Sequence, residues 1–280
     1  MLDAVPRAGA RARERPLDGA DAPLHGTALW TAVAAGITLM ASGPLSYTNS
    51  ADFSRYLPTG TSPLAVVVWT GLGGFLPSVV VTSVGALAAT TVDMSDPQAG
   101  LETILPAWFR PVFPLALVLG SIAINAMTTY SSGLALQAMG VRIRRSLSVL
   151  VDGVLAVALT LYALLVSNFL DTVSNVLQLT VVLLGPSMAI YAADILLRRN
   201  RYDGPALSVE APGGPFWYTG GVNWDGATAL VVGTGAASLC VNTQLYTGPV
   251  ARALDGVDLA LPTGIALAVA AYAILLRPRP

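Results

Sequence analysis

The sequence is poor in charged residues. Only 11% of its 280 residues are charged, and all fifteen basic residues are arginine. A soluble domain carries about 25% charged residues, so this scarcity excludes an ordinary soluble protein. The formal net charge is −1. Because nucleic-acid binding requires a basic face, we expect no nucleic-acid partner.

Cysteine, histidine and the common enzyme motifs are also scarce. Cys240 is the single cysteine, so no internal disulfide forms. His25 is the single histidine and ends a polar stretch, where a lone histidine is usually solvated. The chain lacks the HExxH, GxSxG and P-loop signatures. We therefore expect no enzyme and no bound cofactor.

Apolar residues, in contrast, are abundant and occur in long runs. They make up 54% of the chain, and a helix needs roughly 20 of them to cross a bilayer. Seven stretches qualify, at about 28–57, 63–92, 111–139, 146–167, 170–197, 227–246 and 259–276. The sequence thus predicts an all-α integral membrane protein with about seven transmembrane helices. Residues 1–27 are rich in Arg, Pro and Gly and are predicted to be a disordered tail, and 28–280 the membrane domain.

The first apolar stretch contains Gly43-Pro44 in its middle. A helix that only spans lipid has no reason to break there, because each freed backbone group costs several kcal/mol in hydrocarbon. Broken helices occur where loose backbone lines a cavity, and in transporters that cavity holds the substrate and the coupling ion. A second Gly-Pro pair, Gly185-Pro186, lies in the fifth stretch. An ordinary proline kink in a packed helix explains it at least as well as a functional break does.

The arginines indicate the orientation. Nine of them lie in alternate loops, against two in the opposite loops: Arg55, Arg142, Arg144, Arg145, Arg198, Arg199, Arg201, Arg277 and Arg279 against Arg110 and Arg252. By the positive-inside rule the C-terminus is cytoplasmic, and we expect a multi-pass protein of the cell inner (plasma) membrane. Seven spans then place the arginine-bearing tail outside. We therefore expect the chain to be the C-terminal part of a longer protein, or the product of a late start.

Polar side chains at membrane depth form two groups. One surrounds the break and includes Ser42, Ser46 and Tyr47; the other contains Asn125, Thr128 and Thr129, which share one helix face. Threonine hydroxyls and a backbone carbonyl are hard oxygen ligands that suit Na⁺. An equally good interpretation is that the hydroxyls bond to their own helix and hold no ion.

Several segments resemble the purine–cytosine permeases, the nucleobase–cation symporter family. The segment SADFSRYLP (50–58) looks like the family's signature, and NAMTTYSSGLALQAMGVRIRR resembles its eighth helix. The run GPSMAIYAADILLRRNRYD resembles its tenth helix, and the closing YTGPVARALDGVDLALPTGIALAVAAYAILL is similar to its last loop and helix. The resemblance covers about residues 28–278.

The resemblance implies a leucine-transporter-type fold of two inverted five-helix repeats followed by two peripheral helices. Helices one and six of that fold are broken, and the seven helices here would be helices six to twelve. The second repeat and the peripheral helices would be present, and the first repeat missing.

The resemblance also implies site residues. The family's sodium site would use the Asn125 carbonyl and the Thr128 and Thr129 hydroxyls, with further ligands from helix one. The nucleobase would lie beside the broken helix and the eighth helix, at Ser42, Gly43, Leu45, Ser46, Tyr47 and Tyr130. Gly43 departs from the family, which has an aromatic residue near that position, and Tyr47 is the aromatic residue nearest to it.

Two functions remain open at this point. The first is a permease, driven by Na⁺ or H⁺, for a nucleobase or related small heterocycle of the cytosine, purine, uracil, allantoin or hydantoin class. The second is a transport-incompetent truncated permease, or a membrane assembly subunit that needs a separate N-terminal half as its partner. In both, the lipid bilayer surrounds the chain.

Overall fold

The computed structural model describes residues 24–45, 50–58, 60–92, 97–138, 140, 144–165, 169–207, 209, 211–214 and 216–276. Within these ranges the regular structure is helical, apart from isolated bridges at Thr219–Val222 and Asn242–Thr247. The all-α prediction is therefore confirmed for the described chain. Residues 1–23 of the predicted disordered tail lie outside the described residues, so the prediction is not tested there.

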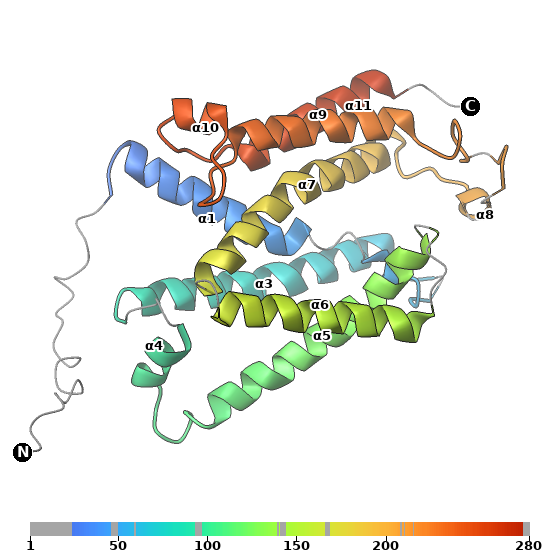
Figure 1. The fold of residues 1–280 in the computed structure, drawn as a ribbon. Helices are drawn as coiled ribbons and strands as arrows, with labels where there is room; N and C mark the ends of the chain where they lie inside the picture. Colours follow the sequence, from blue (N-terminus) through green and yellow to red (C-terminus); the bar gives the residue numbers. More distant parts are fainter. Residues whose placement is uncertain are drawn as a thin grey trace, which may run out of the picture. The chain divides into compact units, whose positions relative to one another are not determined.

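The helices follow the predicted apolar segments closely (Figure 1). In chain order they are α1 (Thr27–Leu45), α2 (Ala51–Ser54), α3 (Pro63–Ala89), α4 (Pro97–Ile104), α5 (Val112–Ala138), α6 (Arg145–Leu165), α7 (Phe169–Leu197), α8 (Gly204–Leu207), α9 (Trp224–Cys240), α10 (Pro249–Ala253) and α11 (Ala260–Leu275). Among the described residues, α3, α5, α6 and α7 are long and apolar enough to cross a membrane, while the apolar parts of α1 and α11 are shorter. The chain is thus a multi-pass helical protein whose described part contains four such helices, and the count of seven spans stays a prediction.

The chain forms two compact units. One contains residues 56–154, and the other contains residues 24–55 and 155–280, with the boundary inside α6. In the first unit, Gly133 of α5 faces α6, because a Cβ on this glycine would lie 3.2 Å from the Ser148 hydroxyl oxygen. Ser131 and Ser148 are both buried there. Small residues therefore let α5 and α6 approach closely at this point.

In the second unit, α9 and α11 pack side by side with α7 against both. The buried residues recur every four positions: Ala229, Gly233 and Ala237 on α9, and Ala260, Gly264, Ala268 and Tyr272 on α11. Residues four apart lie on one helix face. A stripe of small residues lets two backbones come close, which is the usual way that membrane helices associate.

Pro186 of α7 completes this contact. It is fully buried and lies against both glycines, since a Cβ on Gly233 would be 2.9 Å from the Pro186 Cβ and a Cβ on Gly264 would be 3.2 Å from its Cγ. α7 is continuous through Gly185 and Pro186. The second Gly-Pro pair therefore lies in a packed, unbroken helix, as the simpler of its two interpretations predicted.

The prediction of a helix at 227–246 was wrong at its C-terminal end. α9 ends at Cys240, and the chain then turns, with the Gly248 amide donating to the Val241 carbonyl at 2.8 Å. The Asn242 and Thr247 side chains bond to each other within this turn, at 2.9 Å. A Cβ on Gly248 would collide with the Leu239 carbonyl oxygen. Polar side chains that satisfy the backbone locally end the helix here.

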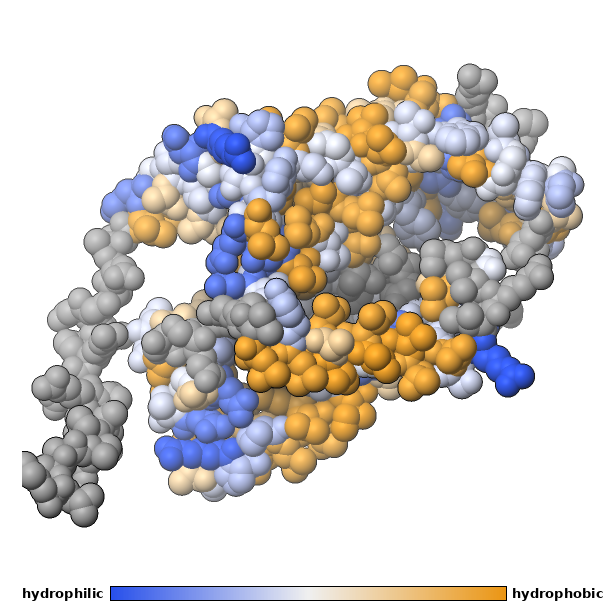
Figure 2. All heavy atoms as spheres, in the orientation of Figure 1, coloured by the Kyte–Doolittle hydropathy of each residue, from blue (hydrophilic) through white to orange (hydrophobic). Residues whose placement is uncertain are grey.

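Large apolar side chains remain exposed along the long helices. Trp69 of α3 is 74% exposed and Leu165 of α6 is 78% exposed. Figure 2 shows apolar residues gathered over the outer surface of α6. Among the residues in the most apolar windows of α3 and α5, none is buried. Surfaces of this kind require lipid or protein to cover them, as expected of a membrane protein.

Candidate functional site

The helix α1 ends close to the first Gly-Pro pair. It runs through Gly43 and Pro44 to Leu45, and the next described helix, α2, begins at Ala51. The Gly-Pro pair thus lies in the last described turn of α1. Ser46 and Tyr47, two of the predicted substrate residues, lie at 46–49, outside the described residues.

The other predicted residues of α1 lie beside α7. The Ser42 hydroxyl donates to the Leu39 carbonyl at 2.6 Å, so it bonds to its own helix. The Leu45 Cδ1 lies 3.9 Å from the point that a Cβ would occupy on Gly185. Because Gly185 has no side chain, the last turn of α1 can approach α7 there. The two Gly-Pro pairs of the sequence are therefore close in space.

The predicted sodium ligands lie together on α5. The Thr128 hydroxyl donates to the Ile124 carbonyl at 2.9 Å, and the Thr129 hydroxyl donates to the Asn125 carbonyl at 2.7 Å. Each hydroxyl thus donates to the carbonyl four residues earlier in its own helix. The sequence had left this bonding pattern open as the alternative to a sodium site. The same bond leaves the lone pairs of the hydroxyl oxygens free to bind a cation. The geometry is compatible with both interpretations.

Tyr130 is the residue after Thr129 on α5, and its side chain hydrogen-bonds to a residue of the DFSRYLP segment. Its hydroxyl lies 2.6 Å from the hydroxyl of Tyr56, and either can donate. This contact joins the family-like signature to the predicted substrate residue within one compact unit. The sequence places both tyrosines near polar segments, but no spacing rule pairs residues 74 positions apart, so the contact was not predicted.

The predicted site residues fall into two groups. Ser42, Gly43 and Leu45 belong to the unit that contains α1, and the α5 residues belong to the other unit. Each group is brought together within its own unit. Among the described residues, no group of three or more His, Cys, Asp or Glu side chains lies close enough to hold a metal ion.

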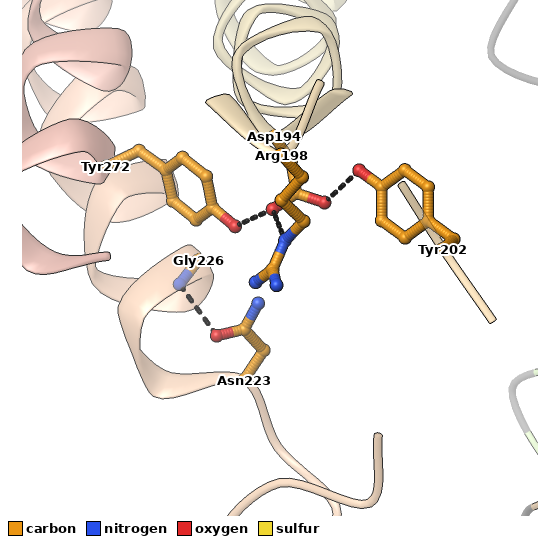
Figure 3. Close-up of polar contacts among 6 residues, drawn as sticks. All are labelled: Asp194, Arg198, Tyr202, Asn223, Gly226 and Tyr272. Carbon is orange, nitrogen blue, oxygen red and sulfur yellow. Dashed lines mark hydrogen bonds and ion pairs between the residues drawn. The ribbon is translucent and has the colours of Figure 1, made fainter. Parts of the chain in front are cut away.

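A further polar cluster lies at the end of α7 (Figure 3). The Asp194 carboxylate accepts from the Arg198 Nε at 2.6 Å, four residues further along the chain. It also accepts from the Tyr202 hydroxyl at 2.6 Å and from the Tyr272 hydroxyl of α11 at 2.5 Å. The two tyrosines were not predicted, because they approach Asp194 from a loop and from another helix. All three donors point toward one carboxylate.

This cluster joins the ends of several segments and has a structural role. Burial and the hydrogen bond to Asp194 raise the pKa of Tyr202, and the same carboxylate raises the pKa of Arg198. Both donors therefore keep their protons at neutral pH. The Asn223 side chain caps α9 by accepting from the Gly226 amide at 3.2 Å and lies beside Arg198. The ends of α7, α9 and α11 thus meet at Asp194 and Arg198.

Comparison with known proteins gives two matches. The sequence profile of the family described as permease for cytosine/purines, uracil, thiamine, allantoin matches residues 17–264. The putative purine-cytosine permease YxlA of Bacillus subtilis (strain 168) is 26% identical over 254 residues, which cover 87% of this chain and 54% of the relative. The chain thus spans about half the length of this curated relative. No solved structure matches the present chain.

Proposed function

Because this chain belongs to the family of permeases for cytosine/purines, uracil, thiamine and allantoin, we propose that it is a secondary active transporter for a nucleobase or a related small heterocycle. The observation that carries the proposal is the family match, which includes all four long apolar helices. The comparisons do not favour the alternative of a transport-incompetent remnant or assembly subunit. The proposed role is transport and not catalysis, with no cofactor other than a coupling ion.

The substrate part of the proposal centres on the end of α1. Ser42, Gly43, Leu45, Ser46 and Tyr47 would border the substrate, together with Tyr130 of α5. An interrupted helix leaves backbone groups without helical partners, and in transporters interrupted helices form the substrate and ion sites near the bilayer midplane. Gly43 and Leu45 lie together in the last described turn of α1, which supports this placement. Tyr56, bonded to Tyr130 at 2.6 Å, would orient that phenol.

The ion part of the proposal centres on α5. Na⁺ would bind the Asn125 carbonyl and the Thr128 and Thr129 hydroxyls, with H⁺ as the alternative coupling ion. The hydroxyl bonds to the preceding carbonyls support this set, because they fix the rotamers and leave oxygen lone pairs free. In an alternating-access mechanism, the bound ion would order α5 beside the substrate before the site changes sides.

The proposal includes a location. The chain would lie in the cell inner (plasma) membrane with its C-terminus cytoplasmic, because arginines gather in alternate loops. Its second inverted repeat and two peripheral helices would form the membrane domain at 28–280.

An uptake assay tests this function. Cells without their own nucleobase permeases would express the chain alone, or the chain joined to the part of the Bacillus subtilis relative that it does not match. Uptake of radiolabelled cytosine, uracil, adenine, hypoxanthine, allantoin and hydantoin would be followed in sodium or choline medium. We expect saturable uptake of at least one compound that falls when choline replaces Na⁺.

Each other outcome has a definite meaning. Saturable uptake that ignores Na⁺ but collapses with a protonophore would assign H⁺ as the coupling ion. Inserted protein that takes up none of the six compounds in either form would contradict the proposed function.

A further inference from the structure

A groove in the second compact unit lies away from the proposed transport residues. It runs between the first half of α1 and the segment that joins α10 to α11, with a volume of about 770 Å³. Ligand pockets in proteins are about 300–1,000 Å³, so the groove has the size of a small-molecule site. Its walls are largely apolar and include Val33, Ile37, Leu254 and Leu261.

Two acidic residues line this groove, Asp255 and Asp258, and Asp258 is the buried one. Asp258 is only 3% exposed. Its Oδ1 accepts from the Ala260 amide at 2.8 Å, whereas its Oδ2 is buried and has no hydrogen-bond partner among the described residues. A buried carboxylate oxygen without a donor is costly. Asp258 is therefore a groove-lining residue with one carboxylate oxygen that lacks a donor among the described residues.

The loop before α11 fixes this carboxylate in place. Asp255 and Gly256 both adopt positive φ angles, 52° and 87°. The Gly256 carbonyl accepts from the Asn242 amide group at 2.6 Å, which ties the loop to the turn after α9. Burial raises the pKa of the Asp258 carboxyl, and the backbone amides of Ala260 and Asn242 oppose that shift. A positive charge beside Oδ2 would stabilise the ionised form.

The lining decides which ligand charge the groove accepts. Among the described residues that line it, none is basic, and Asp255 adds a second acidic group. An anion would meet two carboxyl groups, and a purely apolar ligand would leave Oδ2 unpaired. The indole of Trp30, which also lines the groove, is 65% exposed and can stack on a ring or face a cation.

We propose that this groove binds a protonated amine carried on an apolar body, with the ammonium group at the Asp258 carboxylate and the apolar part between α1 and Leu254. The site is separate from the transport residues at the end of α1 and does not depend on transport. Two sources carry this chemistry: a free organic amine and the ethanolamine headgroup of a lipid.

Calorimetry on the purified 280-residue chain in phosphatidylcholine nanodiscs tests the proposal. The probes are benzylamine, which is protonated at neutral pH, and its neutral and anionic counterparts benzyl alcohol and benzoate. We expect benzylamine to bind more tightly than either. Asp258→Asn keeps the acceptor for the Ala260 amide and removes the charge, so it should weaken benzylamine about tenfold or more and leave benzyl alcohol unchanged.

Two further variants keep the test decisive. Asp255→Asn removes the same charge at the rim and should change benzylamine affinity much less than Asp258→Asn does. Ile37→Trp leaves the carboxylate intact and fills the groove, so it should weaken benzylamine and benzyl alcohol alike. A loss of benzylamine affinity in nanodiscs that contain phosphatidylethanolamine would identify the lipid as the occupant, and an unchanged affinity would identify a free amine.

The contrary results are equally clear. The proposal is wrong if benzylamine does not bind, binds no more tightly than benzoate, or binds Asp258→Asn as well as it binds the unchanged chain. An effect of Asp255→Asn equal to that of Asp258→Asn would also overturn it, because the ligand would then lie at the rim.

Discussion

At the residue scale, the proposed ion site depends on two hydroxyl groups whose role can be separated from simple packing. Thr128 and Thr129 both bond to the carbonyl four residues earlier, and so does Thr160 of α6, at 2.8 Å. The geometry is therefore common to a predicted ligand and to a threonine with no proposed role. What distinguishes Thr129 is the carbonyl that it contacts, that of Asn125, which is itself a predicted ligand.

The change Thr129→Val tests this distinction. Valine keeps nearly the same volume but removes one oxygen, so the Na⁺ concentration for half-maximal uptake should rise. Loss of one such contact costs about 1–3 kcal/mol, or about 5- to 150-fold. Sodium titration of uptake measures the shift, and Thr160→Val is the matched control. If both variants keep the parental sodium dependence, the threonines only pack and the sodium site is elsewhere.

At the element scale, the best-packed part of the chain is the contact of α9 and α11 over Pro186. The apolar runs predicted these helices within a few residues at most ends, because long apolar stretches have few alternatives in a membrane. The end of α9 was missed because its stop depends on the turn around Asn242 and Gly248, and not on hydropathy. The Asp194 contacts were missed because Tyr202 reaches back from the loop after α7 and Tyr272 belongs to another helix, and neither leaves a periodic pattern.

Two glycines of α9 give a direct test of this packing. A Cβ on Gly233 would lie 2.6 Å from the Ala268 Cβ and 2.9 Å from the Gly264 carbonyl oxygen. A Cβ on Gly235 would meet no described atom within 4 Å. Gly233→Ala should therefore lower stability by about 1–3 kcal/mol through overpacking, whereas Gly235→Ala should be neutral or slightly stabilising.

Thermal unfolding of the two variants in the same detergent measures the difference. Equal unfolding temperatures, or a less stable Gly235→Ala, would show that α9 and α11 do not meet along this stripe.

At the scale of the whole molecule, composition alone predicted a multi-pass helical membrane protein, and the family match and the long apolar helices agree. The sequence also placed the predicted ligands Asn125, Thr128 and Thr129 on one helix. It could not assemble a complete site, because Ser42 and Tyr130 belong to different compact units and a contact between distant segments leaves no local pattern. Orientation likewise depends on a loop-charge rule and needs its own test.

Single cysteines report the orientation. In a Cys240→Ala background, Arg201→Cys should be protected from a membrane-impermeant maleimide in intact cells and become labelled after lysis. Gln98→Cys, in the short helix α4 of the connection that is predicted to lie on the opposite side, should be labelled in intact cells. Both positions are exposed, so burial does not explain protection. The reverse labelling pattern would invert the predicted topology.

The central claim is that the substrate binds beside the end of α1, and protection of a cysteine at Ser42 tests it most directly. The variant Ser42→Cys would be made in a Cys240→Ala background, in whichever form of the protein transports, the chain alone or the chain joined to the unmatched part of the relative. Its alkylation would be followed in sodium medium with and without the transported heterocycle. Thr31→Cys, on the same helix, is the control. We predict that the heterocycle slows alkylation at position 42 and leaves position 31 unchanged. Equal alkylation rates at position 42 with and without saturating heterocycle would contradict the account.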